Sequence, residues 1–237
     1  RFGTDGGGHT RLPALMRQAA EIPGVNWLRV LYCYPDETNE ELLDLLSDHP
    51  RICPYLDIPI QHIHSTILRR MHRLGTREDI LRCVRGAKSR GLTVRTTLIV
   101  GFPGETEEQF RELLDFVAET EFDRLGAFTY SPEEGTPAAR MPDQVPEEVK
   151  QERLDRLMTL QQGISLKRNQ ARVGTTEQVL VTDVNGEGFC LGRSAREAPE
   201  IDGEILFSPG KTRPEVGSFL PVRITRAEPY DLYGEAL

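Results

Sequence analysis

Apolar residues in the first 172 positions change repeatedly from strand-like runs to helix-like spacing. The run over residues 93–100 ends in Leu98, Ile99 and Val100 and has the length of a buried parallel strand. Similar runs cover residues 27–34, 55–60 and 125–130, with helical patterns between them. Four strands alternating with helices predict an α/β fold with a parallel sheet. A complete eight-stranded barrel needs about 250 residues, so this part predicts a partial parallel barrel.

A glycine turn follows the third of these runs. Gly101 and Gly104 break the apolar pattern, and Thr106 with Gln109 has the spacing of a helix capping box. Ligands of parallel α/β folds lie at the carboxyl ends of strands, where such turns occur. Without Cβ atoms, the two glycines would let a flat ligand approach the backbone, but an ordinary tight connection needs the same residues.

The pattern changes after Gly174 to short runs separated by turn signals. Residues 179–184 and 219–224 have strand-like patterns, and turns are predicted at Asn185-Gly186, Asp202-Gly203 and Pro209-Gly210. This predicts a second domain, residues 173–237, folded as a small five-stranded β-barrel. The first domain would cover residues 1–172.

Charge and composition limit the partners. Residues 173–237 hold 11 acids and 6 bases, a net of −5, which leaves −3 of the total −8 for the rest of the chain. An acidic barrel favours a basic partner over nucleic acid. There is no run of about 18 apolar residues, so no membrane segment is expected. The four cysteines have no metal-ligand spacing, which is typical of reduced thiols in a cytoplasmic protein.

Five segments together resemble one enzyme family. They are YLDIPIQH (55–62), RTTLIVGFPGETEEQF (95–110), FTYSPEEGTPA (128–138), QVPEEVKQERLDRLMTLQQ (144–162) and GRSAREAPEIDG (192–203). The combination resembles the RimO family of radical-SAM methylthiotransferases, which modify an aspartate of a small-subunit ribosomal protein. The GFPGET run is shared with the tRNA-modifying MiaB type, whereas LDIPIQH and APEIDG are more specific to the ribosomal-protein branch.

The resemblance implies a fold, an activity and cofactors. Residues 1–172 would be the later part of a radical-SAM partial barrel, and residues 173–237 would be a TRAM β-barrel. The reaction would add a methylthio group to the β-carbon of the aspartate, with S-adenosylmethionine and 4Fe–4S clusters as cofactors. The partner would be a basic small-subunit ribosomal protein. A tRNA methylthiotransferase is less favoured because the barrel is acidic, and a non-catalytic partner-binding fragment is a third alternative.

The sequence departs from the family in one respect. The family holds its catalytic cluster with a CxxxCxxC run, and the sequence contains none. Three thiolates at that spacing leave one iron open to bind S-adenosylmethionine, so no metal ligand is assigned in this chain. The expectation is a fragment that begins after the first barrel strands, and the alternative is a degenerate relative without the cluster. In either case the chain would be inactive alone.

Six residues are candidates for binding the cofactor. Gln61 would bond it or cap a strand end, and Arg95 would pair with its carboxylate or with a neighbouring acid. Gly101 and Gly104 would admit the adenine. Glu105 would position the cofactor or stabilise a helix start, and Tyr130 would line the site or belong to the core. Gln61, Gly101 and Tyr130 are expected at one common rim of the sheet.

Four acids in the barrel are candidates for binding the partner. Glu197, Glu200, Asp202 and Glu204 lie close together in one loop segment. Such a cluster would speed encounter with a basic protein and repel an RNA backbone. The alternative is a solvated acidic loop with no partner.

Overall fold

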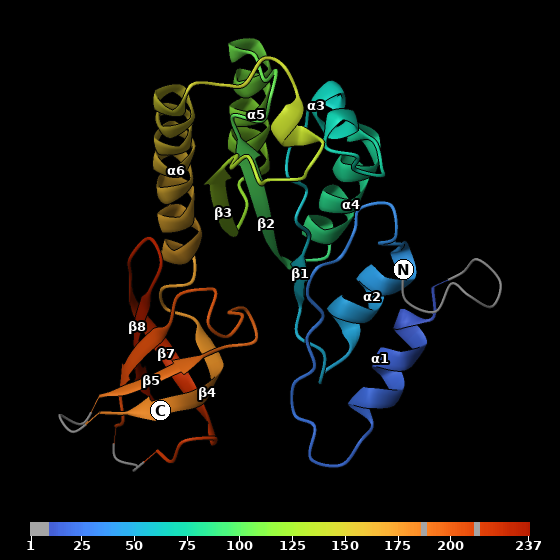
Figure 1. The fold of residues 1–237 in the computed structure, drawn as a ribbon. Helices are drawn as coiled ribbons and strands as arrows, with labels where there is room; N and C mark the ends of the chain where they lie inside the picture. Colours follow the sequence, from blue (N-terminus) through green and yellow to red (C-terminus); the bar gives the residue numbers. More distant parts are fainter. Residues whose placement is uncertain (1–9, 186–188, 211–213) are drawn as a thin grey trace. The chain divides into compact units, whose positions relative to one another are not determined.

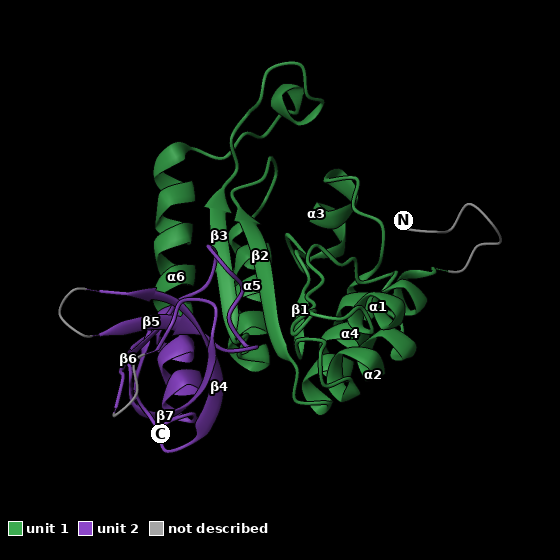
Figure 2. Ribbon diagram, turned by 90° about the horizontal axis from the view of Figure 1, so that it is seen from below, with its two compact units in different colours: residues 1–161 green, residues 162–237 purple. Residues whose placement is uncertain are grey.

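The structure, a computed structural model, describes residues 10–185, 189–210 and 214–237. The chain divides into two units, residues 1–161 and residues 162–237, which Figure 2 colours green and purple. The division falls inside the long helix α6 (Glu147–Gln170), before the boundary predicted after residue 172.

Parallel strands form the sheet of the first unit (Figure 1). Among the described residues this sheet has three strands, β1 (Tyr55–Asp57), β2 (Thr93–Val100) and β3 (Arg124–Thr129), in that order. All pairs are parallel, as predicted. The strand β2 has the predicted bounds, and β3 is shifted by one residue from the prediction.

Two of the four predicted strands are shorter or absent. The strand predicted over residues 55–60 ends at Asp57, and a single parallel bridge from Gln61 to Leu98 resumes the pairing after Pro59. Proline has no N–H to donate, so the ladder stops before it. The strand predicted over residues 27–34 does not form. Among the described residues, this segment makes a single isolated bridge, from Leu28 to Ile52. Tyr32 has φ +62°, a left-handed conformation that turns the chain out of an extended path.

Helices connect the strands, and two of them begin at capping boxes. Thr76 with Asp79 and Thr106 with Gln109 both form capping boxes, in which each side chain bonds the other residue's backbone N–H. Gly91 follows the first of these helices with φ +70°, the conformation of a helix-ending glycine. The helices of this unit before α6 are α1 (Leu12–Ala20), α2 (Glu40–Asp48), α3 (Ser65–Arg70), α4 (Arg77–Ser89), α5 (Glu107–Thr120) and the 3₁₀ helix η1 (Ala138–Arg140).

The second unit is a closed β-barrel, as predicted. Its described strands are β4 (Thr176–Val184), β5 (Cys190–Arg193), β6 (Ile205–Ser208), β7 (Phe219–Ala227) and β8 (Leu232–Ala236), in the order β4-β5-β6-β8-β7. Alternate residues of the strands, among them Val179, Val181 and Phe207, fill the interior. Gly186 of the predicted Asn185-Gly186 turn lies outside the described residues.

Candidate functional site

Three of the candidate residues meet at the carboxyl ends of the parallel strands. Gln61 follows β1 and pairs with Leu98, while Gly101 follows β2 directly. Tyr130 follows β3, and its N–H donates to Val100 O at 2.9 Å. The strand register therefore places all three at one rim, which confirms the predicted co-location.

An apolar pocket of about 620 Å³ opens at this rim. Gln61 and Tyr130 line it, and its other walls were not predicted from the sequence. They come from α3 and its C-terminal end, from β2, and from the loop after β3, and they include Met71, Ile99, Phe102, Ala138 and Met141. Apolar residues are normally part of the core, so their pattern in the sequence does not indicate that these residues border a cavity.

Tyr130 is the polar residue most deeply placed in this pocket. Its ring meets Phe102 edge to face with the ring centroids 5.1 Å apart. Its backbone oxygen accepts a hydrogen bond from Lys150 Nζ at 2.9 Å. The hydroxyl is buried and makes no hydrogen bond with any described residue. A buried hydroxyl without a partner is costly, so it is a candidate to bond a ligand.

Gln61 adopts a strained backbone conformation at the pocket wall. Its φ is +69°, and the N–H of His62 donates to Ile60 O at 2.9 Å across it. A three-residue turn with a positive central φ is rare, and strain of this kind concentrates at functional sites. Backbone bonds from Gln61 N–H to Thr97 O and from Ile99 N–H to Gln61 O hold the turn against β2.

The two glycines serve a different purpose from the predicted one. Gly101 and Gly104 have φ +73° and +77°, so both need glycine for their conformation. A Cβ on Gly101 would lie 2.3 Å from Lys150 Cγ, and one on Gly104 would lie 2.0 Å from Arg70 Nη1. Side chains of this chain therefore occupy the space that was expected to admit a flat ligand.

Glu105 is buried beneath the glycine turn and does not line the apolar pocket. Its Oε2 accepts the Gly101 N–H at 2.9 Å, and its Oε1 accepts from Arg153 Nη1 at 2.9 Å. Burial raises the pKa of Glu105 to about 7, although Arg153 and the Gly101 N–H oppose the shift. The carboxylate thus ties the turn to α6, a role that neither of the predicted alternatives described.

Arg95 pairs with a neighbouring acid, which was the second of its two predicted roles. Its Nη1 lies 2.7 Å from Asp57 Oδ1, and the Asp57 carboxylate is buried. Arg95 is near the amino end of β2, so about 20 Å of strand separate it from Gly101 at the rim. The structure therefore shows the pairing with a neighbouring acid and places Arg95 away from the rim where Gln61, Gly101 and Tyr130 meet.

The acidic loop of the barrel contains one buried and two exposed glutamates. Glu197 is 2% exposed and pairs with Arg172, so its prediction as a partner-binding acid is wrong. Its Oε2 also accepts hydrogen bonds from the N–H and hydroxyl of Ser194. Asp202 is half-buried and accepts the N–H of Ala198, while Glu200 and Glu204 are exposed.

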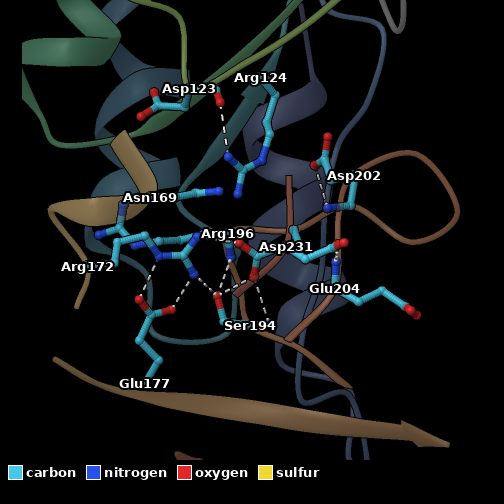
Figure 3. Close-up of polar contacts among 12 residues, drawn as sticks. Asp123, Arg124, Asn169, Arg172, Glu177, Ser194, Arg196, Asp202, Glu204 and Asp231 are labelled. Atoms are coloured by element: carbon cyan, nitrogen blue, oxygen red, sulfur yellow. Dashed lines mark hydrogen bonds and ion pairs between the residues drawn. The ribbon is translucent and has the colours of Figure 1, made fainter. Parts of the chain in front are cut away.

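Arg172 organises the polar cluster beside this loop. Its guanidinium lies between Glu177 and Ser194 (Figure 3), with Nη2 at 2.7 Å from Glu177 Oε2. Burial alone would lower the pKa of Arg172, but the carboxylates of Glu197 and Glu177 outweigh burial and raise it. The cluster is therefore a charged support inside the barrel unit.

The cysteines do not form a metal site. All four are buried, and none of them is in a disulfide. Within residues 10–185, 189–210 and 214–237, no three His, Cys, Asp or Glu side chains are grouped so that they could hold a metal ion. In the same ranges, no helix is long and apolar enough to cross a membrane.

Known proteins resemble the chain over its whole length. The Radical SAM superfamily matches residues 3–117, and the TRAM domain matches residues 173–237. The ribosomal protein uS12 methylthiotransferase RimO of Heliobacterium modesticaldum is 49% identical over an alignment of 238 residues, which covers 100% of this chain and 51% of that protein. The protein of the same name from Geobacter sulfurreducens is 48% identical over 100% of this chain and 53% of its own length.

Among solved structures, coproporphyrinogen III oxidase (HemN) from Escherichia coli, a radical SAM enzyme, has a similar fold. The TM-score is 0.51 at 24% identity, over 65% of this chain and 36% of that chain. The chain spans about half the length of the curated relatives it matches.

Proposed function

Because the chain belongs to the RimO family of radical-SAM proteins, we propose that it is part of a methylthiotransferase acting on ribosomal protein uS12. The reaction would place a methylthio group on the β-carbon of an aspartate, in the cytoplasm where ribosomes are assembled. The observation that supports this most is identity of 45% to 49% to RimO proteins over the whole chain.

The pocket at the rim fits part of S-adenosylmethionine. Apolar walls suit a nucleoside, and the unsatisfied hydroxyl of Tyr130 and the amide of Gln61 can fix its orientation. In this family the cofactor supplies a 5′-deoxyadenosyl radical. Residues of this chain would bind and orient the cofactor. The apolar side chains of Phe102, Ile99 and Met141 would exclude water from it.

The chain's cysteines do not fit the iron–sulfur cluster. Burial raises the pKa of Cys33 to about 12 and that of Cys83 to about 11, whereas a ligand must be a thiolate. The cluster ligands would have to come from another part of a longer protein, and no step is assigned to the cluster here.

Binding of S-adenosylmethionine by the 237-residue chain tests the pocket. Tyr130→Phe removes only the buried hydroxyl, so the affinity should fall by about 3- to 10-fold, the value of one hydrogen bond. Isothermal titration calorimetry measures this. Tyr32→Phe is the matched control, because Tyr32 is 69% exposed and lies outside the pocket.

Two results would contradict the proposal. One is unchanged affinity in a folded Tyr130→Phe protein, which would remove that hydroxyl from the site. The other is failure of a cluster-loaded protein of the relatives' length to add a methylthio group to uS12, followed by mass spectrometry. Transfer to tRNA in the same assay would favour the tRNA-modifying type.

We propose further that the exposed acids of the barrel attract a basic substrate protein. Glu200→Lys with Glu204→Lys should slow association with uS12 by about 10-fold at low salt, because opposite charge speeds encounter. Stopped-flow measurement at rising salt should show the difference vanish, since the screening length is about 8 Å at physiological ionic strength. Glu197 is left unchanged because it supports the barrel from inside.

A matched pair on the same barrel provides the control. Glu215→Lys with Glu235→Lys makes the same change in charge at two exposed positions outside the loop. An equal loss of rate in both double variants would show that net charge, and not this loop, controls encounter. Preference of the unmodified chain for tRNA over uS12 would contradict the charge argument altogether.

A further inference from the structure

His62 is wholly buried directly after Gln61, and its ring is held in one tautomer. The His62 Nδ1 accepts the N–H of His64 at 2.9 Å. Burial lowers the pKa of His62 to about 3, so the ring is neutral near pH 7. A neutral imidazole carries one proton, and since Nδ1 is an acceptor, that proton is on Nε2.

The Nε2–H of His62 has one acidic group near it. It makes no hydrogen bond with a described residue, and Glu105 Oε2 lies 3.7 Å away. This distance is longer than a hydrogen bond, but a shift of less than about 1 Å would close it. The same Glu105 oxygen already accepts the N–H of Gly101.

We propose that His62 and Glu105 are positioning residues for the rim pocket, coupling the strained turn at Gln61 to the glycine turn at Gly101. A residue other than glycine keeps a left-handed backbone conformation only where several surrounding contacts hold it there. The bonds to β2 fix the backbone of Gln61 from one side, and the buried His62 ring fixes it from the other. Glu105, 3.7 Å from that ring, is bonded to the neighbouring strand end and, through Arg153, to α6.

This inference rests on the proposed function only in naming the ligand, S-adenosylmethionine. With the pair in place, Gln61 is presented to the ligand in one conformation. Without the pair, the turn at Gln61 relaxes. Binding must then restore its conformation, which lowers the affinity for the ligand. His62 and Glu105 themselves do not line the pocket.

Two variants of His62 separate positioning from packing. In His62→Gln the side-chain amide reaches the place of Nε2 and keeps a donor toward Glu105. In His62→Asn the amide oxygen replaces Nδ1 but no donor reaches Glu105. We expect His62→Asn to bind S-adenosylmethionine about 10-fold more weakly and His62→Gln to stay within about 3-fold of the original chain.

A second readout does not need the ligand. Hydrogen exchange of the Gly101 amide, followed by NMR, should be faster in His62→Asn than in His62→Gln and the original chain. Melting temperatures of both variants report any general loss of stability. If His62→Asn matches the original chain in affinity and in Gly101 exchange, the proposal is overturned. It is also overturned if the losses of affinity and of exchange protection only follow the change in melting temperature.

The two proposals fail separately. If the original chain does not bind S-adenosylmethionine, the assignment of the pocket is wrong, and Gly101 exchange alone then decides the role of the pair. If the chain binds the ligand but both His62 variants match it in affinity and exchange, the pocket stands and the positioning role is wrong.

Discussion

Replacing Arg172 by Met should destabilise the β-barrel by about 3–5 kcal/mol. The change leaves the carboxylate of Glu197, which is 2% exposed, without its cation. Breaking a buried pair by removing one partner costs that much because an uncompensated charge remains. Glu177, which bonds Arg172 through both carboxylate oxygens, loses its partner as well.

Hydrogen exchange of barrel peptides measures this loss in the whole chain, because it reports opening of one region. Peptides from β4, β5 and β7 should lose protection, while peptides from β2 keep theirs. Arg223→Met is the matched control: Arg223 lies exposed on β7, so the expected change is within about 0.5 kcal/mol. Similar barrel protection in both variants would show that the Arg172 cluster is not a support.

Elements with strong local signals were predicted correctly. The bounds of β2, the capping box at Thr106, and the rim position of Tyr130 each follow from neighbours in sequence or from parallel topology. The closed barrel likewise follows from alternating residues and turns. Local pattern therefore fixed the architecture and located the site to one edge of the sheet.

Side-chain partners were predicted less well because they come from distant segments. An acid in a polar loop is normally exposed, yet Glu197 finds Arg172 at the end of the preceding helix. Arg95 finds Asp57 because strand register sets them opposite each other, which no local pattern reveals. The glycine turn is explained by Lys150 and Arg70, which come from other helices.

Replacing Arg153 by Met should destabilise the first unit by about 1–1.5 kcal/mol more at pH 8 than at pH 5, because pH 8 lies about one unit above the pKa of Glu105 and one pKa unit is about 1.4 kcal/mol. Glu105 is 4% exposed, and Arg153 Nη1 bonds both its carboxylate and its backbone oxygen. At pH 8 the variant leaves a buried carboxylate without a cation, whereas at pH 5 the carboxyl is protonated and needs none.

The sign of this pH dependence follows from the direction of the pKa shift. In the folded chain the pKa of Glu105 is raised to about 7 from 4.5, so the folded state holds the proton more tightly than the unfolded state. Stability from this group is therefore lost as pH rises from about 4.5 through 7. Arg153 opposes the raised pKa, so removing it raises the pKa of Glu105 further and extends the loss of stability to higher pH.

A double variant separates the lost cation from lost packing. Glu105→Gln with Arg153→Met removes both charges, so at pH 8 it should be more stable than Arg153→Met alone. Urea unfolding at pH 5 and pH 8 is measured for the original chain, for the single variants Glu105→Gln and Arg153→Met, and for the double variant. The interaction free energy follows from this cycle of four proteins. A loss for Arg153→Met that is the same at both pH values would mean that packing of its side chain on Phe110 matters more than its charge. In that case Glu105 would not be the group that connects α6 to the glycine turn.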